Sequence, residues 1–385
     1  MVRAAPRVRI LQVITSLAGG AGLHAVQLAR YLDPKRFDVW LAFGSGYPLD
    51  AAVKAERLPH VELRWPRALH PWRTVQGSFD LLRLLQRERF DIVHAHCSLA
   101  GAVARPLARL MRRAAVMFTV HAFAAHERQG ALKRAVLGGV ERGLDRCTDR
   151  YVVSTGHYRD EMIARRIAQR DRIEVIPLGI ALPPLDRSGP DARRRARAEL
   201  GLDDSHEVVM FSGRLETQKG LVFLLQAWAA LVARRPLARL VLLGDGPLHH
   251  ELVRSAASLG IADSVRFAGW RDDAAALLVA ADLFCLPSLW EAFGYVLLEA
   301  MAAGVPILAS RVGGIPEVLA EGEFGRLCPP GDAPALAAGI VAALNDRVAL
   351  AAVAEKAKAH LHAQHDVMRM VQRHADIYLR ELGRT

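Results

Sequence analysis

The sequence predicts an α/β protein with two doubly wound domains, each a parallel sheet covered by helices. Short apolar stretches of strand length alternate with amphipathic stretches of helical length along the whole chain. This alternation is typical of strand–helix–strand units. A proline- and glycine-rich stretch at residues 182–190 interrupts it. Because 385 residues suffice for two domains of ordinary size, we expect domains at 1–187 and 188–365.

The expected strands are short runs rich in branched apolar residues and bounded by residues that favour turns. In the first domain they lie at 8–15, 37–43, 92–94, 116–120, 151–153 and 174–177. In the second domain they lie at 208–212, 239–243, 265–268, 283–287 and 307–310. Amphipathic runs such as 79–89 and 221–234 are the expected covering helices.

The N-terminal residues combine basic, apolar and small side chains, as a secretory signal peptide does. Arg9 and Gln12 interrupt the apolar stretch, however, and the apolar core of a signal peptide rarely contains such residues. We therefore interpret residues 8–15 as the first strand, which runs into a glycine loop at 17–22.

The four cysteines are scattered and form no CxxC pair. This distribution favours a reducing cytoplasm and argues against structural disulfides or a zinc site. No apolar run approaches the roughly 20 residues of a membrane-spanning helix. We therefore expect a cytoplasmic protein.

The positive charge is concentrated in the first half of the chain. Residues 1–187 hold 30 Lys and Arg against 17 Asp and Glu, a balance of +13, whereas residues 188–385 hold 21 against 23. Such a field suits an anionic partner, which would be a membrane surface, a phospholipid-type acceptor or nucleic acid. An arginine-rich solvated surface without any partner is the alternative.

Residues 287–310 hold two carboxylates, Glu291 and Glu299, with seven residues between them. Gly294 lies between the two acids and is followed by a run of helix formers. The N-terminus of a helix behind a glycine turn offers backbone N–H groups and the positive end of the helix dipole. This segment therefore predicts a phosphate site with one acid at its mouth and the other a little over a turn inside the helix.

Two cations, Arg214 and Lys219, flank a turn between an expected strand and helix in residues 211–220. They can hold a diphosphate and neutralise the charge that develops as it leaves. Gly244 and Gly246 mark a second turn at a strand end, and Trp270 and Arg271 follow a third strand. Glycines in a tight connection and a packed tryptophan are the purely structural interpretations.

Together these stretches resemble the retaining glycosyltransferases of the GT-B fold, in particular glycosyltransferase family 4. The resemblance rests on the Glu-x7-Glu spacing, on Gly-Arg-Leu-x-x-x-Lys-Gly at residues 213–220 and on Gly-x-Gly-Pro-Leu at residues 244–248. It implies two Rossmann-like domains facing a central cleft, with the final helix at 366–382 crossing back onto the first domain. It also implies a nucleotide-diphosphate sugar donor of the UDP or GDP type, with neither cofactor nor metal.

The resemblance also implies roles for individual residues of the second domain. Glu291 orients the donor sugar, Arg214 and Lys219 stabilise the leaving diphosphate, and Glu299 accepts hydrogen bonds from the ribose. The remaining residues that it places against the nucleotide are Phe293, Gly294, Tyr295 and Val296 at the phosphates, Gly244 and Gly246 along the nucleotide, and Trp270 and Arg271 at the base.

In the first domain, Gly19 and Gly20 resemble the family's glycine loop, which approaches the diphosphate and the acceptor. They are not part of a GxGxxG motif, which argues against a dehydrogenase. His121 lies where related enzymes carry a histidine near the reacting sugar, and His94 and His96 end the preceding strand. A metal site needs three converging ligands. The sequence shows no such convergence and no Asp-x-Asp motif.

We therefore expect a retaining, metal-independent glycosyltransferase that acts on a glycan or lipid-linked acceptor. Cell-surface polysaccharide synthesis and peripheral binding at the inner face of an anionic membrane are the expected setting, with no nucleic-acid partner. A hydrolase would place its two acids on opposite sides of the scissile bond, whereas Glu291 and Glu299 share one segment. The alternatives that stay open are a phosphorylase and a non-catalytic protein that binds sugar nucleotides or anionic polymers.

Overall fold

The computed structural model describes residues 6–66, 70–123, 130–181 and 189–383. The chain divides into two compact units, and one of them is discontinuous in sequence. Unit 1 comprises residues 1–178 and 367–385, and unit 2 comprises residues 179–366. We predicted the boundary at 187/188, but the structure divides the chain between Leu178 and Gly179. The predicted linker falls mostly on residues 182–188, which lie outside the described residues.

Unit 1 contains a seven-stranded parallel sheet in the order β3-β2-β1-β4-β5-β6-β7. Its strands are β1 (Val8–Ser16), β2 (Phe37–Gly44), β3 (His60–Leu63), β4 (Ile92–His96), β5 (Ala115–Val120), β6 (Arg150–Val153) and β7 (Ile173–Val175). Its helices are α1 (Gly19–Tyr31), α2 (Pro48–Ala55), α3 (Pro71–Arg87), α4 (Ser98–Met111), α5 (Ala131–Leu144), α6 (Gly156–Ala164) and α15 (Val367–Glu381).

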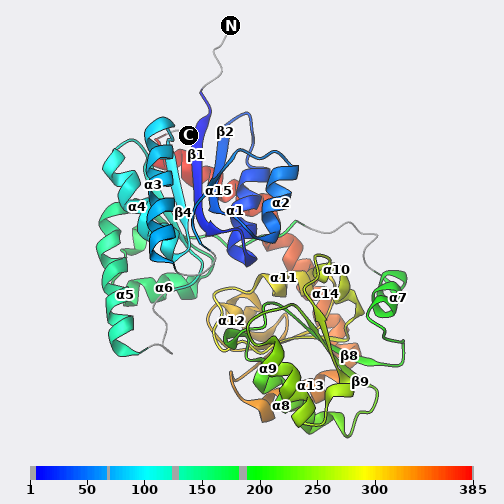
Figure 1. The fold of residues 1–385 in the computed structure, drawn as a ribbon. Coiled ribbons are helices and arrows are strands. Elements are labelled where there is room, and N and C mark those ends of the chain that lie inside the picture. Colours follow the sequence, from blue (N-terminus) through cyan, green and yellow to red (C-terminus); the bar gives the residue numbers. More distant parts are fainter. Residues whose placement is uncertain (1–5, 67–69, 124–129, 182–188, 384–385) are drawn as a thin grey trace. The chain divides into compact units, whose positions relative to one another are not determined.

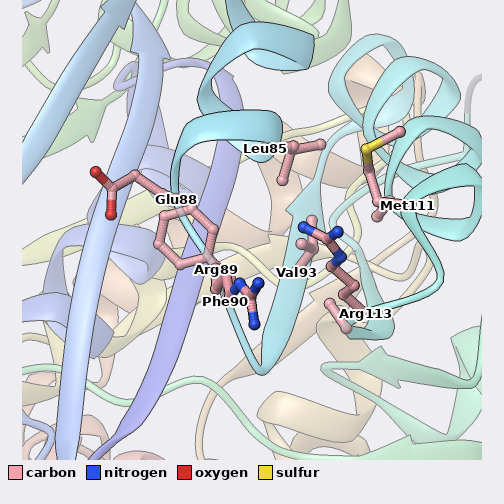
Figure 2. Close-up of a pocket in the computed structure, with 9 residues that line it drawn as sticks. Leu85, Glu88, Arg89, Phe90, Val93, Met111 and Arg113 are labelled. Carbon is pink, nitrogen blue, oxygen red and sulfur yellow. The ribbon is translucent and has the colours of Figure 1, made fainter.

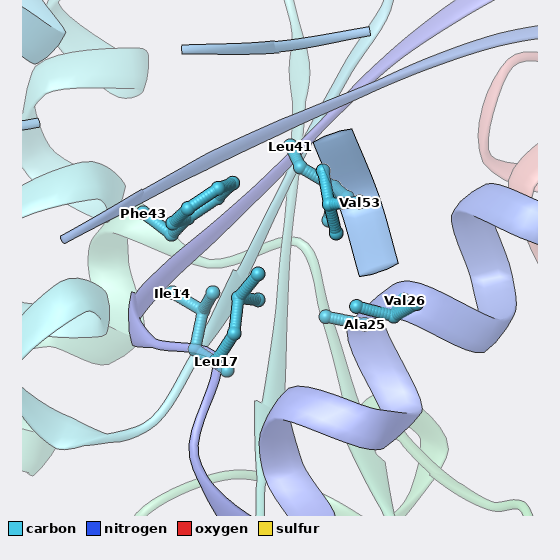
Figure 3. Packing of buried hydrophobic residues seen from close by; sticks show 7 residues of the cluster. All are labelled: Ile14, Leu17, Ala25, Val26, Leu41, Phe43 and Val53. Carbon is cyan, nitrogen blue, oxygen red and sulfur yellow. The ribbon is translucent and has the colours of Figure 1, made fainter. Parts of the chain in front are cut away.

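The helices of unit 1 cover both faces of its sheet. Helix α1 packs against α2 and α15, whereas α4 contacts both α3 and α5 and so completes a continuous row of three helices (Figure 1). A cluster of buried apolar side chains joins α1 to the sheet, with Ala25 and Val26 on the helix and Ile14, Leu41 and Phe43 on the strands (Figure 3). This packing fixes the rotation of α1 and hence the direction in which its buried polar side chains point.

Unit 2 repeats the design with a six-stranded parallel sheet in the order β10-β9-β8-β11-β12-β13. Its strands are β8 (Glu207–Ser212), β9 (Ala238–Leu243), β10 (Val265–Gly269), β11 (Leu283–Leu286), β12 (Ile307–Ser310) and β13 (Arg326–Cys328). Its helices are α7 (Pro190–Glu199), α8 (Leu221–Val232), α9 (His249–Ser258), α10 (Ala274–Leu277), α11 (Tyr295–Ala302), α12 (Ile315–Val318), α13 (Ala333–Asn345) and α14 (Arg347–Gln364).

The predicted fold class, two doubly wound parallel α/β domains, is confirmed. The predicted first strand is present as β1, and the predicted final helix is present as α15 in unit 1. The four cysteines form no disulfide. In the described part of the chain no single helix has the length and apolar composition to cross a membrane. Together α13 and α14 meet both criteria, but they are bent by 97° at the break between them.

A small pocket in unit 1 lies between α3 and α4, where side chains such as Leu85, Val93 and Met111 line it (Figure 2). Phe90 and Ala114, which precede β4 and β5, belong to the same lining. The pocket therefore lies at the amino ends of these strands. In doubly wound sheets ligands bind at the carboxyl ends, so we do not assign the donor or acceptor to it.

Candidate functional site

Each sheet has a topological switch point, where the strand order reverses. It lies between β1 and β4 in unit 1 and between β8 and β11 in unit 2. In open α/β sheets, ligands bind outside the carboxyl ends of the strands at this point. Arg214 and Lys219 follow β8, and Glu291 follows β11. The topology of unit 2 thus brings together segments that are far apart in the sequence.

Lys219 and Glu291 form an ion pair at this switch point, with 2.5 Å between Nζ and Oε2. Their side chains are only 14% and 12% exposed. The Ser288 hydroxyl lies 3.4 Å from the same carboxylate oxygen and donates to it. Two charges this deeply shielded from water interact more strongly than a surface pair does. The ion pair therefore holds the lysine and the acid at fixed positions.

Backbone contacts lock the two loops that carry this pair. The N–H of Leu289 donates to the carbonyl of Gln218, and the side-chain amide of Gln218 donates to the carbonyl of Trp290. Gly220 has a φ of +64°, and a Cβ at this position would lie 2.1 Å from the carbonyl oxygen of Pro287. The loop after β8 can approach the loop after β11 this closely only because residue 220 is glycine.

Arg214 also lies at the carboxyl end of β8, but its side chain is 66% exposed and, among the described residues, forms an ion pair only with Glu216, at 3.7 Å. An exposed pair of this kind contributes little energy. The guanidinium therefore remains available for an anion, in contrast to Lys219, which already neutralises Glu291.

Helix α11 begins directly after this loop, as the glycine turn predicted. Gly294 is its N-cap with a φ of +85° and offers no side chain to cap the helix. Phe293 is buried, and Tyr295 and Val296 are partly exposed in the first turn. A helix N-terminus without a capping side chain suits a phosphate group.

Glu299 lies one turn further along α11, facing Tyr295. Burial raises the pKa of the Glu299 carboxyl to about 7. Burial and the Glu299 charge also raise the pKa of the Tyr295 hydroxyl. Among the described residues no side chain or backbone group pairs with the Glu299 carboxylate. A largely shielded acid without a partner is costly, so this half-buried position favours a ligand that donates hydrogen bonds.

Packing within unit 2 requires the two glycines of the predicted turn after β9, Gly244 and Gly246. A Cβ on Gly244 would lie 1.9 Å from the carbonyl oxygen of Gly213, and one on Gly246 would lie 2.5 Å from that of Leu215. Both glycines therefore let the loop after β9 pack against the loop after β8. Their predicted contact with a nucleotide stays a prediction.

The two residues predicted at the base lie beyond β10 and are engaged with carboxylates. Trp270 is 59% exposed, and its indole N–H donates to Asp272 at 3.1 Å. Arg271 pairs with Asp273 at 2.7 Å and also with Glu199, and these partners raise its pKa. Trp270 offers an exposed face for stacking, whereas Arg271 is held by acids of its own unit.

The predicted glycine loop of unit 1 is shorter than expected, because α1 begins at Gly19. Gly19 has a φ of +60° with open space around it, and Gly20 belongs to the first helical turn. The tight approach occurs instead at Gly22, where a Cβ would lie 2.4 Å from the backbone of Leu17.

Histidines converge at the carboxyl ends of β4 and β5, and no sequence pattern indicates this convergence. His96 Nδ1 lies 3.1 Å from His121 Nε2. His24 on α1, His96 and His121 each offer one nitrogen, and these three atoms lie within 4.8 Å of one another. The rings of His94 and His96 are 4.4 Å apart, and the ring of His374 on α15 is 5.0 Å from that of His24. The structure thus supplies the convergence that the sequence does not show.

A chain of hydrogen bonds fixes the protons of this cluster. The Gln12 amide donates to the Tyr378 hydroxyl at 3.0 Å, and that hydroxyl donates to His94 Nδ1 at 2.7 Å. The Gln12 carbonyl accepts from His96 Nε2 at 2.6 Å. His96 Nδ1 therefore carries a lone pair, which accepts the proton of His121 Nε2.

The imidazoles of the cluster are neutral at pH 7. Burial, followed by repulsion from neighbouring imidazoles, lowers the pKa of His24, His94 and His96 well below the usual value. Burial lowers the pKa of His121 to about 3 and that of His374 to about 4. Neutral imidazole is the form that accepts hydrogen bonds and binds metals.

Models of two glycosyltransferase domains match the chain. The model described as Glycosyltransferase Family 4 covers residues 18–182, and the model described as Glycosyl transferases group 1 covers residues 192–360. The first lies largely within unit 1 and the second within unit 2. Each half of the chain thus matches a glycosyltransferase family model.

Named enzymes are similar to most of the chain. The UDP-Gal:alpha-D-GlcNAc-diphosphoundecaprenol alpha-1,3-galactosyltransferase of Escherichia coli is 27% identical over 93% of this chain and 94% of its own length. The glycogen synthase of Mycobacterium tuberculosis is 32% identical over 76% of this chain and 69% of its own length. The prediction of an enzyme that uses nucleotide sugars is confirmed.

Solved structures share the fold. Anabaena HepE in complex with UDP-glucose superposes with a TM-score of 0.83 and 23% identity, covering 96% of this chain and 99% of its own. Sucrose-phosphate synthase from Thermosynechococcus elongatus superposes with a TM-score of 0.84 and 23% identity over 97% of this chain and 99% of its own. With both units matched in sequence and in structure, the chain belongs to the glycosyltransferases of family 4, which have the GT-B fold.

Proposed function

We propose that this glycosyltransferase moves a sugar from a UDP-sugar to a glycan or lipid-linked acceptor, with retention of configuration and without a metal. The observation that carries the proposal is the shielded pair of Lys219 and Glu291 at the switch point of unit 2, next to the uncapped N-terminus of α11. Lys219 and the N-terminus of α11 suit the diphosphate of such a donor, and Glu291 suits the hydroxyls of its sugar.

The leaving group is the nucleoside diphosphate. The bond between the anomeric carbon and the phosphate oxygen breaks, and the acceptor oxygen bonds to the same face of that carbon. The acceptor proton passes to the departing phosphate oxygen. Lys219, Arg214 and the N-terminus of α11 stabilise the negative charge that develops, which is preorganised electrostatic catalysis. Glu291 binds hydroxyls of the sugar and orients it, and the role of His121 stays a prediction.

Support for UDP comes from the relatives. The E. coli enzyme is named for UDP-Gal, and the Anabaena structure contains UDP-glucose. Glu299, half-buried on α11 and without a partner among the described residues, is suited to accept hydrogen bonds from the two ribose hydroxyls. The same E. coli enzyme is named for an acceptor on a diphosphoundecaprenol lipid, which supports a lipid-linked acceptor.

The row of helices on unit 1 supports a membrane-bound acceptor. Large apolar side chains are exposed at helical spacing on two of them, with Trp72, Val75 and Phe79 on α3 and three more, Leu132, Val136 and Val140, on α5. No residue of α5 is fully buried. Apolar stripes on basic helices are typical of proteins that lie on anionic membranes. We propose that this face binds the membrane.

The transfer reaction is tested with a panel of UDP- and GDP-sugars in the presence of EDTA. We expect transfer with a UDP-sugar, an α-anomeric product and no loss on chelation. Lys219→Met and Glu291→Gln each lower kcat by about 100-fold or more, as the loss of one preorganised group does. The partly exposed Arg239→Met, on β9 of the same unit, is the control. Full transfer by the Lys219 and Glu291 variants would contradict the proposal.

The membrane proposal has a separate test, sedimentation with vesicles. We expect binding to vesicles that contain anionic lipid, weaker binding at high salt and none to purely zwitterionic vesicles. The Trp72→Ser/Phe79→Ser variant loses binding. The matched control is Val253→Ser, an exposed apolar residue of unit 2. Equal binding of both variants would show that α3 is not the contact.

A further inference from the structure

We propose that His24, His96 and His121 of unit 1 form a binding site for one divalent transition-metal ion of the zinc type. The three side chains come from α1, from the end of β4 and from the residue after β5. They offer one ligand atom each, all within 4.8 Å of one another. Neither the enzyme family nor the transfer reaction requires such a site.

The geometry is close to that of a metal centre. Zinc binds imidazole nitrogens at about 2.0–2.1 Å, so two nitrogens of a tetrahedral site are roughly 3.3 Å apart. His96 Nδ1 and His121 Nε2 are already 3.1 Å apart. A shift of the His24 ring by at most roughly 1.5 Å would complete the set, given the spacing that zinc requires.

His24 provides the independent indication of a ligand. Both of its ring nitrogens are buried, and neither has a hydrogen-bond partner among the described residues. Its ring lies 5.4 Å from that of His96 and 5.2 Å from that of His121. A buried polar group left without any partner costs roughly 1–3 kcal/mol, and a bound ion is one of the few explanations for it.

The surrounding residues hold the ligands as those of metal sites do. The Gln12 carbonyl accepts the Nε2 proton of His96, which fixes the ring and leaves the Nδ1 lone pair free to coordinate. Tyr378 holds Gln12 in turn. When a metal binds, the proton of His121 moves from Nε2 to Nδ1, and the hydrogen bond between His96 and His121 gives way to two metal–nitrogen bonds.

The ligand set selects the metal. Three imidazoles and no carboxylate suit zinc, cobalt, nickel or copper, whereas magnesium and calcium require oxygen ligands. His374 Nε2, which is also buried without a partner among the described residues, is the candidate for the fourth position. His94 is excluded as a ligand, because Tyr378 and Thr119 occupy both of its nitrogens.

The site is tested on tag-free, chelator-treated protein titrated with Co²⁺ and, by calorimetry, with Zn²⁺. We expect one equivalent of Co²⁺ to produce the visible absorption of a tetrahedral nitrogen site and Zn²⁺ to displace it. The affinity falls at least 100-fold in His121→Gln, which is half-buried and spares the core. His24→Asn gives the same loss, whereas His362→Gln, exposed on α14, binds as the wild type does.

Gln12→Leu separates a metal site from adventitious binding. It removes the group that orients His96 but no ligand, so we expect a 10- to 100-fold loss of affinity. Near-UV circular dichroism verifies that each variant is folded. Absence of the cobalt absorption in the wild type, or equal affinity in His121→Gln and the wild type, would overturn the proposal. Neither result depends on transfer, so failure here leaves the proposed reaction standing.

Discussion

At the scale of the residue, Lys219 and Glu291 combine a chemical role with a structural one. Removing one partner of a shielded ion pair leaves the other charge without compensation, which typically costs 3–5 kcal/mol when the pair is fully buried. The two side chains here keep 14% and 12% exposure. The cost should therefore lie at or below the lower end of that range.

We expect Lys219→Met to lower the free energy of unfolding by about 2–3 kcal/mol. The double variant Lys219→Met/Glu291→Gln recovers most of this loss, because no unpaired charge remains. In both variants kcat stays about 100-fold or more below that of the wild type. Denaturant unfolding alongside kcat measurements distinguishes the two roles, and a double variant as unstable as the single one would argue against the ion pair as a source of stability.

Glu299 makes stability and ligand binding depend on pH. Its pKa is about 7 in the folded protein against an ordinary value of 4.5. Because the pKa is raised in the folded protein, the protonated Glu299 carboxyl contributes its full stabilisation of the fold below pH 4.5. This contribution is lost as the pH rises through about 7. The loss amounts to about 3 kcal/mol by linkage. Thermal unfolding of Glu299→Gln and the wild type between pH 5 and 8 measures it, and parallel curves would refute it.

The same carboxyl gives a signature of nucleotide binding. Ribose hydroxyls that donate to the carboxylate favour its charged form, so binding of UDP near pH 6.5 releases a proton. Calorimetry in buffers of different ionisation enthalpy detects this release. We expect it to disappear in Glu299→Gln, whereas Glu317→Gln, an acid on α12 of the same unit, should retain it.

The candidate residues of unit 2 could be selected from the sequence, because each group lies in one short segment with a recognisable spacing. Arg214 and Lys219 are five residues apart, and Glu291 and Glu299 are eight apart. The histidine cluster had no such signal. His24, His96 and His374 come from separate elements, and only the packing of α1 and α15 on the sheet brings them together.

At the scale of the element, the loops after β8 and β11 depend on one glycine. Gly220 and Gly260 have nearly the same backbone conformation, with φ of +64° and +67°. A Cβ at 220 would collide with the Pro287 carbonyl, whereas the space around 260 is open. The two positions therefore separate the cost of the left-handed conformation from the cost of the collision.

We expect Gly260→Ala to cost about 1 kcal/mol, the ordinary penalty of a left-handed residue. Gly220→Ala should cost about 3 kcal/mol, since the loop must also move. It should lower kcat as well, because Lys219 is the adjacent residue. Unfolding and transfer assays on the pair provide the measurement, and equal effects of both variants would show that the loops are not tightly coupled.

Both strands that the sequence failed to predict are edge strands. β3 and β13 end their sheets and contain only four and three residues. A central strand of a parallel sheet is buried on both faces and reads as a continuous apolar run. An edge strand is half exposed and short, so His60–Leu63 and Arg326–Cys328 carry no comparable pattern.

At the scale of the whole molecule, unit 2 is an insertion within unit 1. Its two ends are neighbours, since Ile180 pairs with Asp366 as a parallel bridge and donates to the carbonyl of His365. We expect residues 179–366 to fold as an isolated fragment with cooperative thermal unfolding. A chain that ends at Asp366 should contain a folded unit 2 and an unfolded unit 1, which limited proteolysis would reveal. Proteolysis of the fragment at the rate of an unfolded chain would contradict this.

The position of α15 at the end of the chain affects folding during translation. Tyr378 binds Gln12 across 366 residues of sequence. The ribosome therefore releases every strand of the first sheet well before the helix that completes its core, while the inserted unit is finished earlier. Until translation ends, α1 exposes the apolar and histidine surface that α15 later covers. The nascent chain should thus be vulnerable to aggregation and a client of chaperones.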